Sequence, residues 1–254
     1  MRAGQSKAGR LALRRAATAI LASACVQVAQ GALPQDVELD NSSAVRKAIE
    51  SGAATPDTRV PSADYGAPGV PILALAARAG SVQVVRLLLS LKADPNARTP
   101  AGETPLMLAS FVPDEPGEFG APNSGAHIQI VHALVEAGAD IENPGQLTAT
   151  SYAAFAGQLE ILRYLLDHGA SPDGGATGER PAHPTPLIFA VIQGKQAAAR
   201  LLLERGANPN IKGPTGDDVL AYARKYGRTD LMPTLECALA IGPGQQFAEV
   251  CKGR

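Results

Sequence analysis

The stretch that decides the fold runs from Thr185 to Asn210 and reads TPLIFAVIQGKQAAARLLLERGANPN. Thr185 can cap the N-terminus of a helix, and Pro186 then sits in the first turn, where a missing N–H costs nothing. Gly194 supplies the left-handed residue that ends this helix. A second helix with a stripe of alanines and leucines follows, and Gly206 ends it. A helix pair this small cannot bury its apolar face alone, so it needs copies of itself on both sides.

Copies of this unit recur along the chain. Their equivalent starting positions are Pro71, Thr104, Thr148, Thr185 and Asp218, spaced by 33, 44, 37 and 33 residues. The matching motifs are Thr104-Pro105-Leu106-Met107-Leu108-Ala109 at a start, and Gly138-Ala139-Asp140, Gly169-Ala170-Ser171 and Gly206-Ala207-Asn208 at the ends. This pattern resembles the ankyrin repeat over roughly residues 40 to 240. The resemblance implies an all-α ankyrin-repeat solenoid of stacked helix–turn–helix units with short hairpin-like loops.

The repeats predict how the chain is divided. The expected parts are a signal peptide at 1–31, an N-terminal capping half repeat and loop at 32–68, four repeats at 69–217, a C-terminal capping repeat at 218–241 and a tail at 242–254. Capping units are expected because an interior repeat exposes apolar surface on both sides. Pro and Gly predict a loop at 53–68 and an insertion at 113–125 in the second repeat, whose second helix then begins near His127.

The N-terminus has the pattern of an export signal. Residues 1–35 contain no acid, and five basic residues precede a short apolar run. A basic start, a short apolar core and small residues near its end are typical of a secretory signal peptide, with cleavage expected before Ala32. An exported, periplasmic protein is therefore expected, without a membrane span. Two alternatives remain open: a lipid anchor at Cys25, which Leu21 disfavours by lying one residue too early, and an organelle transit peptide.

Charge and cysteine usage fit this expectation. Residues 1–31 hold five of the 23 Lys and Arg and none of the 24 Asp and Glu, so their removal leaves a formal net charge of −6. An acidic solenoid should repel nucleic acid. The cysteines that remain are Cys237 and Cys251, which an oxidising compartment would join as a disulfide. The alternative is a pair of unrelated thiols in a reducing cytoplasm.

The sequence offers no constellation of residues for catalysis. The four histidines, His127, His132, His168 and His183, have no metal-ligand spacing, and there is no Cys-x-x-Cys. The glycine run at 174–178 has neither a preceding strand nor a following Gly-Lys-Ser/Thr, so it is not a phosphate loop. We therefore expect no catalytic residue, no metal ion and no cofactor.

The resemblance instead implies a binding surface. Ankyrin proteins usually grip partner proteins with the concave side, made from hairpin tips and first helices. Position by position, this implies Arg98, Glu103, Glu142 and Gln146 at the tips and Arg78, Phe155, Gln193, Lys225 and Tyr226 on the first helices. Phe155 and Tyr226 are the expected anchors, because aromatic residues concentrate binding energy, although Phe155 could equally pack against a neighbouring repeat. Phe119 in the insertion either forms a further anchor or tucks back onto the solenoid.

The resemblance thus implies a non-enzymatic module that binds another protein, as an exported adaptor or inhibitor. The small exported bacterial ankyrin proteins that this chain resembles include some linked to oxidative-stress protection and some that serve as immunity partners of secreted toxins. A second hypothesis is a small-ligand or enzyme-accessory protein that uses the loops at 113–125 and 172–184.

Overall fold

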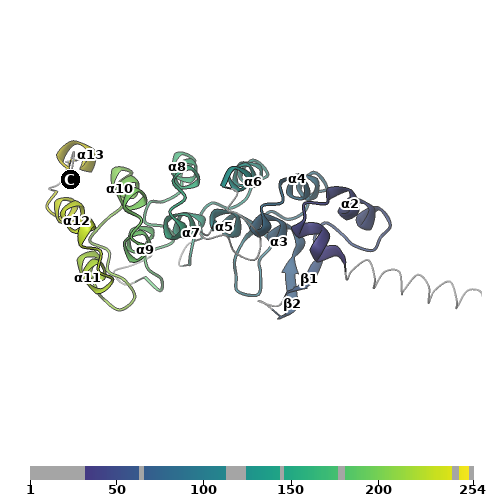
Figure 1. Ribbon diagram of the computed structural model, residues 1–254, viewed down its shortest axis with the longest axis horizontal. Helices are drawn as coiled ribbons and strands as arrows, with labels where there is room; N and C mark the ends of the chain where they lie inside the picture. Colours follow the sequence, from purple (N-terminus) through teal and green to yellow (C-terminus); the bar gives the residue numbers. More distant parts are fainter. Residues whose placement is uncertain are drawn as a thin grey trace, which may run out of the picture.

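The computed structural model describes residues 32–62, 66–112, 124–143, 146–176, 181–241 and 246–251 of the chain. Its helices stack side by side in two layers along an elongated molecule (Figure 1). The first layer holds α3 (Ile72–Ala79), α5 (Pro105–Ser110), α7 (Ala149–Ala156), α9 (Pro186–Gln193) and α11 (Val219–Lys225). The second holds α2 (Ser42–Glu50), α4 (Val82–Ser90), α6 (Ser124–Glu136), α8 (Leu159–Asp167) and α10 (Gln196–Glu204). Successive helices of each layer contact one another, which confirms the predicted all-α solenoid.

The repeat motif itself sets where the first helices begin and end. The Thr185 side chain accepts a hydrogen bond from the Ile188 N–H, and Pro186 follows it at the start of α9. Gly194 then ends α9 with a left-handed φ of 67°. Thr148 and Gly157 do the same for α7. These caps pair backbone N–H and C=O groups at the helix ends with partners in the same repeat. Residues within one repeat therefore set where each short helix begins and ends.

The interior first helices α5, α7 and α9 are each buried between the first helices of the adjacent repeats. All six residues of α5 are buried, and α5 contacts α3 on one side and α7 on the other. Side chains from both layers join in one continuous hydrophobic core. Burial of the first layer therefore depends on neighbouring repeats, as the small size of one unit requires.

A ladder of hydrogen bonds joins the loops of successive repeats. At each step a side-chain oxygen in one loop accepts the backbone N–H at the equivalent point of the next. The four steps are Asp57 with Asp94 N at 2.8 Å, Asn96 with Asp140 N at 2.8 Å, Glu142 with Ser171 N at 2.5 Å and Asp173 with Asn208 N at 2.8 Å. This loop ladder fixes the offset between repeats whose lengths differ.

Polar side chains also join the repeats at the opposite end of the first helices. Each lies near the start of a second helix and contacts the backbone carbonyl at the end of a first helix in the preceding repeat. The contacts are His127 Nε2 with Arg78 O at 3.3 Å, Gln158 Nε2 with Val112 O at 3.0 Å and Arg228 Nη2 with Ile192 O at 2.9 Å. Cations and amide donors suit this position because the C-terminal carbonyls of a helix carry partial negative charge.

The N-terminal region is more structured than the sequence indicated. The prediction of a loop over all of 53–68 is wrong, because β1 (Arg59–Ser62) and β2 (Gly66–Pro71) pair as an antiparallel hairpin. Pro and Gly are tolerated there because a two-stranded sheet consists of edge strands only. Residues 32–38 form a helix that the sequence analysis did not identify, and its Leu33 and Val37 are buried.

The insertion of the second repeat is shorter at its C-terminal end than predicted. Helix α6 begins at Ser124, three residues before the expected start, so Ser124 and Gly125 belong to the helix. Residues 113–123, including Phe119, lie outside the described residues. The long closing loop of the third repeat is described at 171–176 and 181–184.

The C-terminal end is closed by a short helix and a disulfide. After α11 come η1 (Thr229–Leu231), α12 (Met232–Leu239) and α13 (Phe247–Val250). Cys237 in α12 is bonded to Cys251, with their Cα atoms 6.0 Å apart. Helix α13 contacts α10, and Phe247 is buried. Residues 246–251 of the expected tail therefore pack against α10 (Figure 1).

The loop ladder predicts a measurable loss of stability when one acceptor is removed. Asn96→Ala deletes the oxygen that receives the Asp140 N–H, which should cost about 1 kcal/mol and lower Tm by roughly 2–4 °C. Asn210→Ala is the matched control, because the Asn210 side chain makes no inter-repeat hydrogen bond within the described residues. Thermal unfolding followed by circular dichroism measures both. Equal effects of the two changes would contradict a stabilising ladder.

The disulfide predicts sensitivity to reductant. It links residues 14 apart, so the Cys237→Ser, Cys251→Ser double variant should lose about 3 kcal/mol of unfolding free energy through greater freedom of the unfolded chain. Urea unfolding with and without dithiothreitol measures this. The reductant should lower the midpoint of the unchanged protein to that of the variant and leave the variant unaffected. A reduced protein that keeps its midpoint would show that the bond does not secure α13.

Candidate functional site

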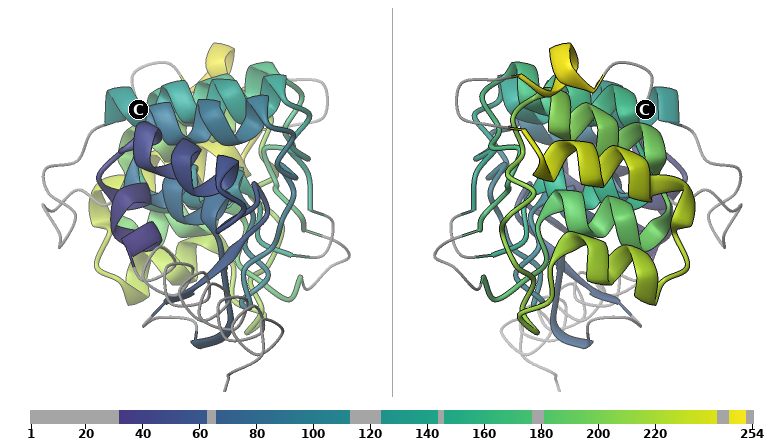
Figure 2. Two further views of the ribbon diagram at one scale, coloured as in Figure 1. Left: turned by 90° about the vertical axis from the view of Figure 1, so that its right-hand side faces the viewer. Right: turned by 90° about the vertical axis from the view of Figure 1, so that its left-hand side faces the viewer.

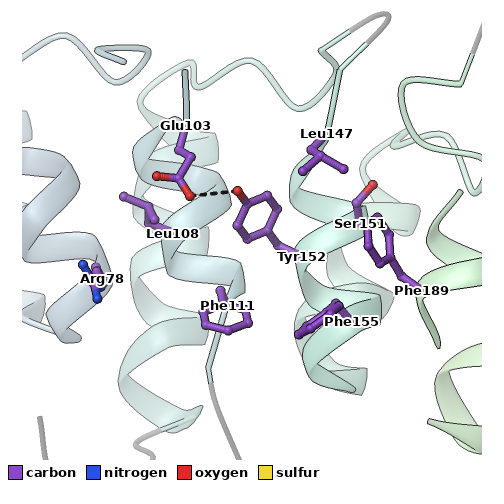
Figure 3. A pocket seen from close by; sticks show the side chains of 9 residues that line it. All are labelled: Arg78, Glu103, Leu108, Phe111, Leu147, Ser151, Tyr152, Phe155 and Phe189. Carbon is purple, nitrogen blue, oxygen red and sulfur yellow. Dashed lines mark hydrogen bonds between the residues drawn. The ribbon is translucent and has the colours of Figure 1, made fainter. Parts of the chain in front are cut away.

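An apolar groove opens on the side of the first helices, next to the loops. Its volume is about 390 Å³, and Figure 3 shows its lining side chains. The lining residues are Arg78, Glu103, Leu108, Phe111, Leu147, Ser151, Tyr152, Phe155 and Phe189. They come from α3, from the loops that precede α5 and α7, and from α5, α7 and α9. The groove therefore spans four repeats.

Four aromatic rings form a continuous row along this groove. The ring centroid of Phe111 lies 6.1 Å from Tyr152 and 5.9 Å from Phe155, and Phe155 lies 5.7 Å from Phe189. The Phe111–Tyr152 and Phe155–Phe189 pairs meet edge to face, a favourable geometry for aromatic pairs. All four side chains are half-buried, so each keeps a face available to a partner.

Hydrogen bonds fix the polar edge of the groove. The Tyr152 hydroxyl donates to Glu103 Oε1 at 2.8 Å, as Figure 3 shows. Thr99 Oγ1 donates to the other carboxylate oxygen of Glu103 at 3.2 Å. These contacts join the loop before α5 to helix α7 and hold the Tyr152 ring in place. A partner would therefore meet side chains that are already ordered, which lowers the entropy cost of binding.

Two regular positions in the repeat generate the groove. Counting from each N-cap residue, the fourth position is occupied by Leu108, Tyr152 and Phe189, and the seventh by Arg78, Phe111 and Phe155. Residues three apart on a helix lie on the same face, so these two positions face the open side together. The row of rings arises because aromatic residues occupy one or both of these positions in consecutive repeats.

The structure brings together three of the residues proposed from the sequence. Arg78, Glu103 and Phe155 line the groove (Figure 3). Gln193, Lys225 and Tyr226 do not line it. Tyr226 stacks on Tyr222 with centroids 6.5 Å apart, and the Lys225 ammonium lies 5.8 Å from the Tyr226 ring centre. These two form a separate exposed group on α11 and at its C-terminus.

The proposed loop residues mainly connect the loops. Arg98 donates to Asn143 Oδ1 at 3.1 Å and to Gly102 O at 3.0 Å, and Glu142 accepts the Ser171 N–H of the ladder. Gln146 is exposed and lies close to Asn143. Arg98 and Glu142 therefore have structural contacts of their own in addition to any role in binding. Phe119 lies outside the described residues.

The sequence analysis missed Phe111, Tyr152 and Phe189. A signal for them existed, because Tyr152 and Phe189 each stand four residues after a capping threonine, and Phe111 stands seven after Thr104. The residues proposed from the sequence occupy the seventh position after the N-cap in α3, α7 and α11 but the eighth in α9, at Gln193, which does not line the groove. The row is visible when the repeats are aligned on their N-caps.

The histidines described by the structure have separate roles. His127 is buried and belongs to the inter-repeat contacts, whereas His132 and His168 flank the Tyr164 ring at centroid distances of 4.1 and 3.9 Å. Burial raises the pKa of Tyr164 above its ordinary value, and the negative charge of Glu136 adds a smaller rise. Among the described residues no group of three or more His, Cys, Asp or Glu could hold a metal ion.

Comparisons with known proteins agree with this geometry. First, the two layers of stacked helices joined by a loop ladder define a helical repeat solenoid. Second, residues 69–100 match the model of the ankyrin repeat, and residues 120–213 match the model of three copies of ankyrin repeats. The chain belongs to the ankyrin-repeat family, whose repeats generally mediate protein–protein interaction. No curated protein matches the chain.

Within the described residues, no helix has both the length and the apolarity to cross a membrane.

One carboxylate of the loop ladder should make stability depend on pH. Burial raises the pKa of Asp173 above its ordinary value, and the hydrogen bond from the Asn208 N–H partly opposes this rise. The folded state thus binds this proton more tightly than the unfolded state. The stability contributed by Asp173 is complete below its unfolded pKa of about 3.9 and is lost as pH rises through the higher folded value.

Asp173→Asn keeps an oxygen for the Asn208 N–H and removes the buried charge. Its urea midpoint should exceed that of the unchanged protein at pH 7, and the difference should shrink as pH falls toward about 4. Asp173→Ala is the control: it removes the acceptor as well, so it should be less stable than Asp173→Asn at both pH values. A lower midpoint for Asp173→Asn at pH 7 would contradict the direction of the pKa shift.

Proposed function

We propose that this chain is a non-enzymatic binding module that holds a partner protein along the groove of the first helices, as an exported adaptor or inhibitor. The observation that carries the proposal is the row formed by Phe111, Tyr152, Phe155 and Phe189. Aromatic side chains in a preformed groove supply large contact area at a small cost in conformational entropy. Glu103 and Arg78, which lie on opposite edges of the groove, add selectivity.

Export is supported by two features. The N-terminus has the basic and apolar pattern of a signal peptide. The disulfide between Cys237 and Cys251 suits an oxidising compartment. Toxin immunity and stress protection differ in the partner and not in the groove, so the identity of a captured protein would decide between them.

The volume of the groove also favours a second candidate, a small apolar ligand. About 390 Å³ lies within the range of small-molecule sites. The described part of the loop at 172–184, by contrast, borders cavities of about 10 and 90 Å³, which are smaller than such sites. A ligand would therefore occupy the aromatic groove, and a metabolite screen by thermal shift would reveal it through a rise in Tm that Phe155→Arg abolishes.

Crosslinking in the native cell tests the proposal. Phe155→Arg places a charge in the middle of the aromatic row and should weaken partner capture by at least about tenfold, as expected for a central aromatic anchor. Leu159→Arg is the matched control, because Leu159 is 37% exposed at the start of α8 in the second layer. The measurement is mass spectrometry of crosslinked full-length chain, with circular dichroism to confirm folding.

The expected result is one dominant protein that is lost with Phe155→Arg and kept with Leu159→Arg. Retention of that protein by Phe155→Arg would place the interface elsewhere. Loss with both variants would also count against the groove.

A further inference from the structure

The groove offers a partner side chains and no free backbone. Its floor comes mainly from α5, α7 and α9, whose backbone groups bond within each helix or to the caps at its ends. A strand laid along this floor would leave its own N–H and C=O groups unpaired on that side. A helix carries its backbone hydrogen bonds with it.

The spacing of the rings matches the surface of a helix. Adjacent ring centroids lie 5.7, 5.9 and 6.1 Å apart. The Cβ atoms of residues three or four apart on a helix are separated by about 5–6 Å. Successive apolar side chains of a docked helix can therefore pack between successive rings.

Charge differs between the two edges of the groove. The loop edge carries carboxylates, with Glu103 in the groove wall and Asp57, Asp94, Asp140 and Glu142 in the adjoining loops, against Arg59, Lys92 and Arg98. The hydrogen bond that Glu142 accepts comes from a neutral backbone N–H, so its charge remains. The loop edge is therefore acidic overall.

Among the described residues, the opposite edge, at the C-terminal ends of the first helices, carries basic side chains. Arg78 ends α3 and lines the groove. The Lys195 side chain lies against Gly157 at the end of α7, and Arg228 donates to Ile192 O at the end of α9. The described residues place no carboxylate in the last turns of α3, α5, α7 and α9. Residues 113–123, which contain Asp114, Glu115 and Glu118, follow α5 outside the described residues.

From these features we infer that the groove binds an amphipathic helix whose apolar stripe lies on the aromatic row, with one flank basic and the other acidic. The inference rests on the proposed function and names the class of its partner. The basic flank meets the loop edge at Glu103, and the acidic flank meets the edge at Arg78. Because these edges differ in sign, they also set the direction in which the helix lies.

Synthetic peptides of about 18 residues, roughly 27 Å of helix, test this class. The segregated peptide carries a Leu and Phe stripe with Lys on one flank and Glu on the other. The mixed peptide has the same composition and stripe, with Lys and Glu distributed over both flanks. Fluorescence anisotropy with the full chain should show the segregated peptide binding at least about tenfold more tightly. Arg78→Glu should abolish this advantage.

A third peptide tests the direction in which the helix lies along the groove. Exchanging the Lys and Glu flanks reverses the orientation that satisfies both edges, so this peptide should bind with similar affinity in the opposite direction. A photocrosslinker at the N-terminus of each peptide should therefore label opposite ends of the groove. Crosslinking of both peptides at the same end would overturn the assignment of the two edges.

Equal binding of the segregated and mixed peptides, or no binding of either, would overturn the inference, as would preference for a proline-rich peptide without helical structure. The proposed function has a separate readout in the native crosslinking of Phe155→Arg. A partner lost there while no helical peptide binds would leave the groove as the interface and reject a helix as its occupant. Replacement of residues 113–123 by a Gly/Ser linker should preserve the preference for the segregated peptide.

Discussion

The structure depends on one constraint: a first helix of six to eight residues is buried only when other elements pack on both sides of it. Helix α5 is buried at every residue and α7 at six of its eight, and each lies between two others of its layer. Close approach of such thin layers requires small side chains, which explains the abundance of alanine in a chain with only 4% aromatic residues. It also explains the two ends. Residues 32–38 with α2 cover one end, and α12 and α13 cover the other, because an uncovered repeat would leave apolar surface in water.

Stacking alone does not fix the offset between successive repeats. The hydrogen bonds at the two ends of the first helices fix this offset. The loop ladder uses Asp, Asn and Glu interchangeably, so what matters is an oxygen at the point where the next loop presents an N–H. Partners in this ladder are 29 to 44 residues apart. The long second repeat therefore keeps its place in the stack: Asn96 still accepts the Asp140 N–H although the chain between α5 and α6 is longer than in the other repeats.

The sequence predicted what is local and repeated, and it missed what depends on contacts between distant segments. Capping threonines and αL glycines fix the first helices, so Thr185 and Gly194 were identified correctly. The hairpin of β1 and β2 was missed because its prolines and glycines are typical of loops, and only the partner strand makes it a sheet. In the candidate site, Arg78, Glu103 and Phe155 were found by position, but Phe111, Tyr152 and Phe189 were not. The helix positions that face the open side depend on how neighbouring repeats cross. The sequence of a single repeat does not determine this arrangement.

The same constraint explains why the groove can carry function. Most positions of a first helix face a neighbouring repeat and must be small or apolar, but the seventh position after the cap faces the open side. Its occupants are Arg78, Phe111, Phe155, Ile192 and Lys225, none of them buried. The stack thus accepts a cation, an aromatic ring or an aliphatic side chain there. Packing between repeats therefore does not account for aromatic residues at this position in two adjacent repeats, where Phe111 contacts both Phe155 and the Tyr152 ring that Glu103 holds in place. The fold does not require this ordered aromatic row, and for that reason the row supports the proposed binding groove.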